Sequence, residues 1–290
     1  MSSTTLIAGL VTGLLLGGLF AICALGLSLV FGIMRLVNVV HGELLVLAAY
    51  LNFTLGRWAG IDPLLSLLIL VPIMFGFGFL IQKTILNPLM NKGDEAPLLT
   101  AFGLSIIAQN LFLLIWKADT RSLNTEYTGL GLPVAGIQIP LMYLLEFVIA
   151  IVLILLVHLF MRKTFLGKAM RAAALDADTA RVMGINPKFV YAFTYGMGSA
   201  VAALGGTLIA MTFSFVPTTG LVWLLNGFVV VVLGGLGSVF GTLGAGFLLG
   251  AAEGLGGAIF GTGYRELVGY IIFLIVLIMR PSGLFGRSNG

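Results

Sequence analysis

Few side chains in this sequence could do chemistry, and most of these stand inside or beside apolar runs. Asn38, His41 and Glu43 lie between two such runs, and Glu253 interrupts another. Polar groups in apolar surroundings must be paired, hydrated or engaged in moving a proton or a ligand. We therefore expect these four residues to face a translocation path or a gate. The alternative is structural, with Asn38 as a helix cap, Glu43 in an early turn, and Glu253 in a packed hydrogen bond or a subunit contact.

These residues match no pattern of a catalytic or metal-binding site. His41 and His158 are the two histidines and lie far apart in the sequence, and Cys23 is the single cysteine. No Gly-x-x-x-x-Gly-Lys-Ser/Thr pattern occurs, so the chain does not bind ATP through a P-loop. We expect no catalytic residue, no metal and no cofactor. An intramembrane enzyme is an alternative that no set of residues supports.

A second group of polar residues lies in one long connection between apolar runs. Lys168 to Met183 is rich in alanine and is predicted to form a helix, with Gly184 just past its end and Pro187 stopping it. Such a helix either lies on the headgroups or docks in a groove of a partner protein. The residues that would take part are Lys168, Arg171, Asp176, Asp178, Arg181, Gly184 and Asn186.

The composition places the whole chain in a membrane. Of 290 residues, 59% are hydrophobic and 9% are charged, whereas soluble domains are about 25% charged. This excludes a soluble enzyme, a disordered chain and a disulfide scaffold, and the net charge of +4 is too small and scattered for nucleic-acid binding. The polar connections are too short for a soluble domain. We expect one transmembrane domain over residues 1–290, with residues 165–188 as a loop within it.

The apolar runs predict an all-α bundle of about eight to nine transmembrane or re-entrant helices. A spanning helix needs about 20 mostly apolar residues, and no run alternates as a barrel strand does. The run ending in Gly234 and Gly235 is short enough to be re-entrant. The predicted segments are Leu6–Ile33, Leu36–Leu55, Pro63–Ile81, Pro97–Trp116, Leu141–Met161, Phe189–Val216, Trp223–Leu233, Val239–Phe260 and Leu267–Met279.

The basic residues predict the orientation. Six of the fifteen lysines and arginines lie in or next to the connection at 165–188, and positive charge gathers on the cytoplasmic side. Lys83, Lys92 and the arginines near the C-terminus fall on the same side, whereas the N-terminus before the first apolar run has no basic residue. We expect the N-terminus outside and the C-terminus inside.

Glycines spaced four apart predict close helix crossings. We expect them to pack helices within the chain, with a subunit interface as the alternative. The stretches 26–50 and 233–253 each join a glycine-punctuated apolar run to a small-residue helix. This similarity suggests two inverted repeats, as in many transporters. The packing glycines singled out are Gly237, Gly241, Gly246 and Gly250, with Gly13, Gly17 and Gly254 at the same spacing.

Three motifs resemble one family over nearly the whole chain. Asn38-Val-Val-His-Gly-Glu43 resembles the Asn-Phe-Ala-His-Gly-Glu motif of branched-chain amino acid permeases, although the two residues before His41 are both valine. Arg171-Ala-Ala-Ala-Leu-Asp176 with Ala180-Arg-Val-Met-Gly-Ile-Asn186 looks like the coupling loop of ABC importer permeases. Gly234-Gly-Leu-Gly-Ser-Val-Phe-Gly241 resembles the family's glycine-rich stretch. The chain is most similar to the LivH-type subunit.

The resemblance implies a non-catalytic permease of the bacterial inner membrane. Its partners would be a homologous LivM-like permease, two P-loop ATPase subunits and a periplasmic substrate-binding protein. The segment 165–188 would couple ATP hydrolysis to alternating access, and the substrates would be branched-chain or related small amino acids. The competing hypothesis is a stand-alone, ion-coupled secondary transporter, in which His41 and Glu43 could carry protons.

Overall fold

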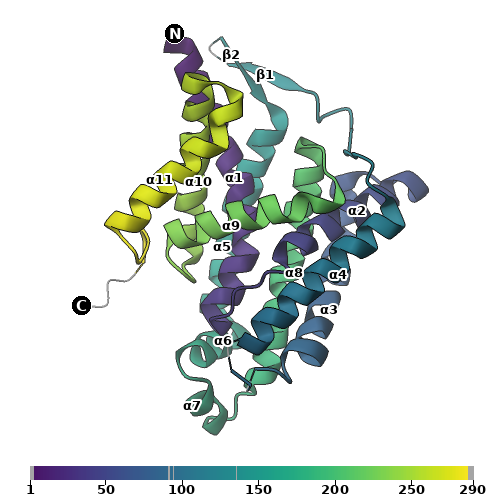
Figure 1. The fold of residues 1–290 in the computed structure, drawn as a ribbon, viewed down its shortest axis with the longest axis vertical. Coiled ribbons are helices and arrows are strands. Elements are labelled where there is room, and N and C mark those ends of the chain that lie inside the picture. Colours follow the sequence, from purple (N-terminus) through teal and green to yellow (C-terminus); the bar gives the residue numbers. More distant parts are fainter. Residues whose placement is uncertain (1–2, 91, 94, 135, 287–290) are drawn as a thin grey trace.

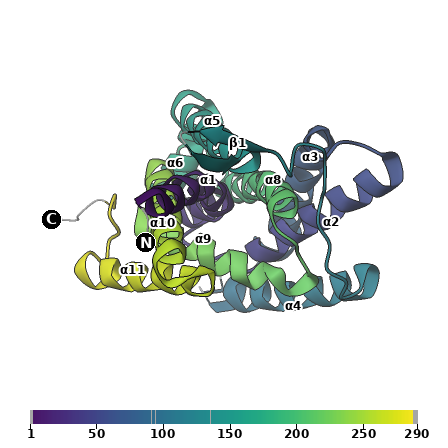
Figure 2. The ribbon, with the colours of Figure 1, turned by 90° about the horizontal axis from the view of Figure 1, so that it is seen from above.

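The computed structural model describes residues 3–90, 92–93, 95–134 and 136–286. Within these ranges the regular elements are helices and one two-stranded hairpin, and the helices gather around α1 (Figures 1 and 2). The elements are α1 Ser3–Met34, α2 His41–Ala59, α3 Pro63–Ile81 with a π-helical extension Gln82–Leu86, α4 Glu95–Trp116, β1 Gly131–Val134, β2 Ile137–Pro140, α5 Leu141–Lys163, α6 Phe165–Leu175, α7 Ala177–Val182, α8 Pro187–Thr212, a 3-10 turn Pro217–Thr219, α9 Gly220–Gly234, α10 Val239–Phe260, a 3-10 turn Thr262–Tyr264 and α11 Arg265–Met279.

In the described part of the chain, eight helices are long and apolar enough to cross a membrane, within the expected eight to nine. The helix α2 is not among these eight, which are counted by length and hydropathy, so the predicted span 36–55 stays a prediction. Glu43, Asn52 and Arg57 lower its hydropathy. The helix α2 begins at His41, later than the predicted residue 36. Arg35, with a positive φ of 53°, ends the helical conformation after Met34 of α1.

The first helix forms the centre of the bundle. Every residue from position 15 to position 30 is buried, and α5, α8, α9 and α10 all contact α1. An α-helix that is apolar on all sides is stable only when it is surrounded, here by other helices. Its 32 residues extend for about 48 Å, longer than the roughly 30 Å hydrocarbon core of a bilayer. Figure 2 shows α1 enclosed by its neighbours.

The helices α1 and α10 cross at glycines. A Cβ on Gly17 would lie 2.5 Å from the carbonyl oxygen of Gly246, and a Cβ on Gly250 would lie 2.6 Å from the Cα of Gly17. Such distances are too short for any side chain, so only glycine allows these backbones to meet. Gly246 and Gly250 therefore lie in a contact within this chain.

The glycines before α10 make further backbone contacts. Gly237 has a positive φ of 79°, and a Cβ there would lie 2.7 Å from the Cα of Gly32 in α1. Gly241 packs against Gly234 at the end of α9, where a Cβ on Gly234 would lie 2.6 Å from the carbonyl carbon of Gly241. The two stretches compared as repeats thus lie against each other, and the inverted repeat itself stays a prediction.

The connection between α4 and α5 contains an antiparallel hairpin that the sequence analysis did not anticipate. Gly131 of β1 pairs with Pro140 of β2, and Gly136 in the turn has a φ of 81°. Upstream, the backbones of Arg121 and Phe215 exchange hydrogen bonds of 3.0 and 2.8 Å. The connection is thereby tied to the end of α8, at the end of the bundle where Figure 1 shows the N-terminus.

Candidate functional site

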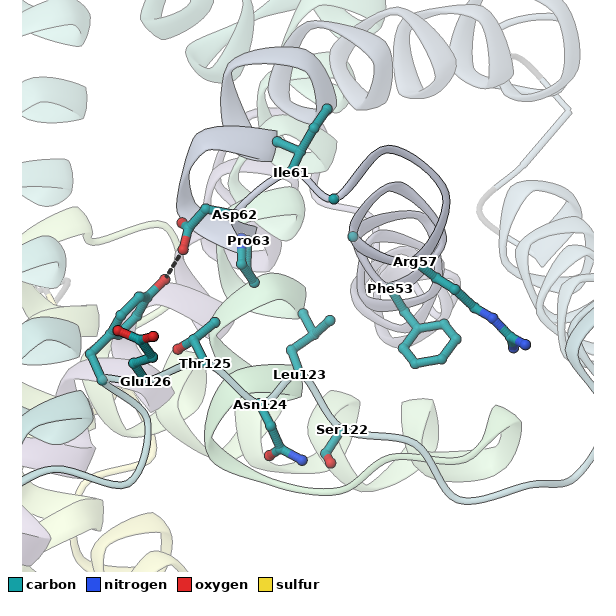
Figure 3. A pocket seen from close by; sticks show the side chains of 13 residues that line it. Phe53, Arg57, Ile61, Asp62, Pro63, Ser122, Leu123, Asn124, Thr125 and Glu126 are labelled. Atoms are coloured by element: carbon teal, nitrogen blue, oxygen red, sulfur yellow. Dashed lines mark hydrogen bonds between the residues drawn. The ribbon is translucent and has the colours of Figure 1, made fainter.

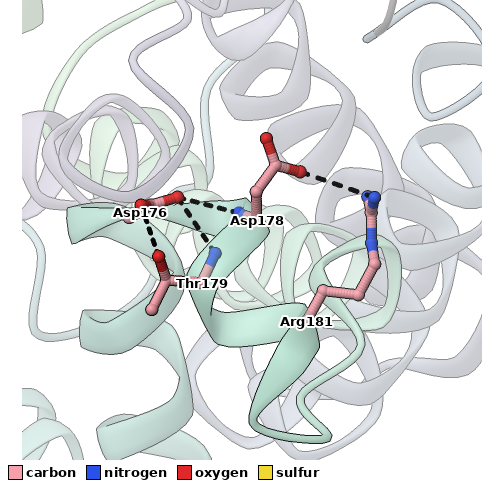
Figure 4. Close-up of polar contacts among 4 residues, drawn as sticks. All are labelled: Asp176, Asp178, Thr179 and Arg181. Carbon is pink, nitrogen blue, oxygen red and sulfur yellow. Dashed lines mark hydrogen bonds and ion pairs between the residues drawn. The ribbon is translucent and has the colours of Figure 1, made fainter.

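The segment 165–188 lies at the end of the bundle opposite the hairpin (Figure 1). The predicted single helix from Lys168 to Met183 is wrong, because the chain forms α6 and α7 with a bend at Asp176. The Asp176 backbone is extended, with φ −155° and ψ 111°. Its carboxylate accepts hydrogen bonds from the backbone N–H groups of Asp178 and Thr179 at 2.9 and 3.1 Å, as in Figure 4. Asp176 therefore ends one helix and caps the next.

The hydrogen bonds at this cap also change the acidity of Asp176. The Thr179 hydroxyl donates to the carboxylate at 2.6 Å. This bond, with the two backbone bonds, lowers the pKa of Asp176 below its usual value. An ionised carboxylate at the first turn of α7 also interacts favourably with the helix dipole. The bend between α6 and α7 is therefore stabilised by the charged form of Asp176.

The other residues expected in this segment are exposed. Arg181 forms an ion pair with Asp178 at 3.4 Å (Figure 4). Gly184 has a φ of 82°, as expected for the residue after a helix. Asn186 instead begins the next element, since its Oδ1 accepts from the backbone N–H of Phe189 at 3.3 Å to cap α8. Lys168 and Arg171 of α6 are exposed and form no ion pair in the described part of the chain.

Besides Phe165 at the start of α6, which is 79% exposed, three large apolar residues of this segment are exposed, and the sequence analysis missed them. Leu175, Val182 and Met183 are 83%, 87% and 77% exposed. Met170 and Ala173 on α6 are buried instead. In the sequence, the signal for the three exposed residues was an apolar residue at the end of each short helix. We call Leu175, at the end of α6, and Val182 and Met183, at the end of α7, the apolar tip.

The four polar residues expected at membrane depth are all buried. Asn38 accepts a hydrogen bond from the Tyr195 hydroxyl at 3.0 Å. The predicted cap at Asn38 is wrong, because residue 40 is the N-cap of α2 and no side chain caps it. Glu253 pairs instead with Arg265 of α11, with 3.0 Å between Oε2 and Nε. The side chains of Asn38 and Glu253 are therefore held by different helices, α8 and α11 respectively.

His41 and Glu43 stand in the first turn of α2 and contact two further helices. His41 Nε2 lies 2.8 Å from the Cys23 carbonyl oxygen of α1, so Nε2 is the protonated nitrogen. Glu43 accepts from the Ser105 hydroxyl of α4 at 3.3 Å. Among the described residues, His41 Nδ1 and Glu43 Oε2 have no hydrogen-bond partner. These two atoms are buried acceptors that a passing ligand or a water molecule could use.

A cavity of about 520 Å³ lies near the α4–α5 connection and was not predicted (Figure 3). Arg57 and Glu126 line it, with Asp62 and Tyr127. The Tyr127 hydroxyl donates to Asp62 Oδ2 at 2.8 Å, and burial together with this bond raises the pKa of Tyr127 to about 12. Within the described residues, no group of three or more His, Cys, Asp and Glu is placed to hold a metal ion.

Comparisons with known proteins place the chain in a family. A family model described as "Branched-chain amino acid transport system / permease component" matches residues 9–278. The chain is 32% identical to the branched-chain amino acid permease protein BraD of Pseudomonas aeruginosa, covering 97% of this chain and 95% of that protein. It is 30% identical to LivH of Escherichia coli K12, over 96% and 94% of the two chains. No solved structure matches the chain.

A further relative belongs to the second permease type. LivM of Escherichia coli K12 is 24% identical, over 93% of this chain and 68% of that protein. The family consists of non-catalytic membrane subunits of ABC transporters, whose ATPases are separate chains and which work with a binding protein. Because the family model covers almost the full length and eight helices of the described residues are long and apolar enough to span a membrane, the chain is a multi-pass membrane protein that belongs to the family of branched-chain amino acid transport permeases.

Proposed function

We propose that this chain is one permease of an importer for branched-chain or related small amino acids. A LivM-like permease would be its membrane partner, and two P-loop ATPases and a periplasmic binding protein would complete the complex. The family match over residues 9–278 supports the substrate class. The observation that carries the docking role is the apolar tip, exposed at an end of the bundle that is rich in charge.

We also propose that this end faces the cytoplasm of a bacterium, with the chain in the inner membrane. The basic residues around α6 support this orientation. The N-terminus and the hairpin would then be periplasmic, and the C-terminus cytoplasmic. The cavity near Tyr127 would open toward the binding protein.

In the proposed importer, the ATPases would act on the membrane helices through α6. Leu175, Val182 and Met183 would insert into a groove of one ATPase, and charged residues such as Asp178 and Arg181 would surround the groove. The opposite face of α6 packs Met170 and Ala173 into the core, and α6 contacts α1, α5 and α8. Because packed interiors transmit displacement rather than absorb it, closure of the ATPase pair would move these helices.

Asn38, His41, Glu43 and Glu253 would then line the path or the gate. Three of them connect the start of α2 and the residues before it to α1, α4 and α8. A rearrangement of α2 would exchange these hydrogen bonds for others. Vectorial transport requires only that the substrate and the ATPase state favour different arrangements.

Co-purification from native membranes in a mild detergent tests the assembly. A second permease and P-loop ATPases are expected with this chain. Recovery of this chain alone, active in liposomes without ATP, would refute the importer and favour an ion-coupled transporter that uses His41 and Glu43.

A paired variant tests the docking surface. Val182→Ala with Met183→Ala should reduce ATPase recovery and ATP-driven uptake about tenfold or more, since each truncation removes apolar area from the interface. Leu130→Ala is the matched control, an exposed apolar residue at the opposite end of the bundle. Equal recovery of the ATPase with both variants would overturn this assignment.

A further inference from the structure

A second, larger cavity lies at the same end of the bundle as α6. Its volume is about 930 Å³. The walls come from the last turns of α1 and α5, from α6, and from the turn between α9 and α10. Ile33, Met161 and Phe240 contribute an apolar wall. The cavity thus lies at the ends of helices that are expected to span the membrane, where they reach the membrane surface.

Among the described residues that line this cavity, the lysine, arginine, aspartate and glutamate class is represented by arginine alone. Arg35 just after α1, Arg162 of α5 and Arg171 of α6 line it, and neither aspartate nor glutamate is among the lining residues. All three are exposed, and none forms an ion pair in the described part of the chain. Arg181, only a few residues away, is instead paired with Asp178. The cavity therefore concentrates positive charge that the protein does not neutralise.

The remaining polar groups of the cavity suit the same kind of ligand. The His158 ring lies against the Phe240 ring, with 4.5 Å between the centroids and the planes tilted by 53°, and both rings line the cavity with Ser238. Guanidinium groups bind phosphate through paired N–H donors. The apolar wall beside them suits a hydrocarbon chain. A small inorganic anion would satisfy the arginines but leave this wall uncovered.

We propose that this cavity binds an anionic phospholipid, with the phosphate at Arg35, Arg162 and Arg171 and an acyl chain along the apolar wall. Basic pockets between membrane helices bind such headgroups. The leaflet is the cytoplasmic one if the orientation under the proposed function holds, but binding itself does not depend on docking of an ATPase. The site would make the position of α6 relative to α1 and α5 sensitive to the anionic lipid content of the membrane.

Native mass spectrometry of the purified transporter, titrated with phosphatidylglycerol or phosphatidylcholine of the same chain length, tests the proposal. Phosphatidylglycerol should bind more tightly. Each arginine contributes about fivefold in affinity, so the double variant Arg35→Gln, Arg162→Gln should bind it about 25-fold more weakly. The matched control is Lys83→Gln, an exposed cation of the π-helical extension of α3 that does not line the cavity; it should leave binding unchanged.

Three outcomes would overturn the proposal. These are equal binding of the two lipids, an equal loss with Lys83→Gln, and displacement of phosphatidylglycerol by excess inorganic phosphate, which would indicate a small-anion site. If the double variant does not fold, Arg162→Gln alone should weaken binding about fivefold. Measuring ATPase recovery in the same preparation keeps the lipid proposal separate from the docking proposal. If the purified chain binds phosphatidylglycerol but carries no ATPase, only the docking proposal is refuted.

Discussion

Replacing Gly250 by alanine tests the contact between α1 and α10. The new Cβ would lie 2.6 Å from the Cα and the backbone N of Gly17, and it would overlap the carbonyl oxygen of Gly13. Carbon atoms in favourable contact are about 3.5–4.0 Å apart. All three neighbours are backbone atoms, so no side chain can rotate away. The helices must therefore separate by about 1 Å at this point.

The cost follows from two opposing effects. Overpacking a well-packed interior costs about 1–3 kcal/mol, and alanine in a helix is favoured over glycine by roughly 0.5–1 kcal/mol. The expected net loss is about 1–2 kcal/mol. Gly103→Ala in α4 is the matched control, because a Cβ there meets nothing within 4 Å. The control variant should lose no stability, and it can gain the roughly 0.5–1 kcal/mol by which a helix favours alanine over glycine.

Thermal denaturation in detergent, followed by size-exclusion chromatography, measures the difference. Gly250→Ala should lower the midpoint by about 2–8 °C, and Gly103→Ala should leave it unchanged or raise it. An unchanged midpoint for Gly250→Ala would refute the argument. If the variant kept its midpoint but separated from a second permease, the glycines would belong to a subunit interface instead.

Three further predictions concern polar contacts. Arg265→Ala leaves the buried Glu253 carboxylate without its partner and should destabilise the protein by about 3 kcal/mol, and a Glu253→Gln, Arg265→Gln double variant should recover part of this loss in thermal denaturation. The Asp176 pKa is lowered in the folded chain, so its cap should stabilise α7 above the usual carboxyl pKa and be lost as pH falls through the lowered value. Hydrogen exchange at the start of α7 checks this, and Asp176→Asn should remove the pH dependence. The raised pKa of Tyr127, about 12, means that its bond to Asp62 is fully present below the ordinary tyrosine pKa of about 10 and is lost as pH rises through the higher value. Protease cleavage of the α4–α5 connection should therefore increase at alkaline pH. Tyr127→Phe should abolish this dependence on pH, whereas an increase that persists in the variant would exclude the Tyr127–Asp62 bond as its cause.

Helices with strong local signals were predictable to the residue. The spans Pro63–Ile81 and Val239–Phe260 agree with α3 and α10 in both bounds. Asp62 caps the first with its side chain, and Ser238 caps the second. Each cap is followed by an apolar run of spanning length. Capping and apolar length depend only on neighbouring residues, so both can be read from the sequence.

The errors arose where a local signal competed with a longer pattern. The alanine-rich stretch after Lys168 favoured one continuous helix, but Asp176 offers its carboxylate to the N–H groups two and three residues ahead and starts a new one. The hairpin lies in a connection for which the all-α prediction gave no strand, although Ile137-Gln-Ile139 alternates as a strand does. Both signals were present but short.

The sequence by itself determined that the chain is a helical membrane protein, which segments are apolar, and which family it resembles. These properties follow from composition and from patterns within about 20 residues, because a helix satisfies its backbone hydrogen bonds internally. Only the tertiary structure decided that Asn38 meets Tyr195, that Gly250 meets Gly17, and that Arg35, Arg162 and Arg171 share one cavity. Such contacts join residues distant in the sequence, and they depend on how whole helices pack, which no local pattern encodes.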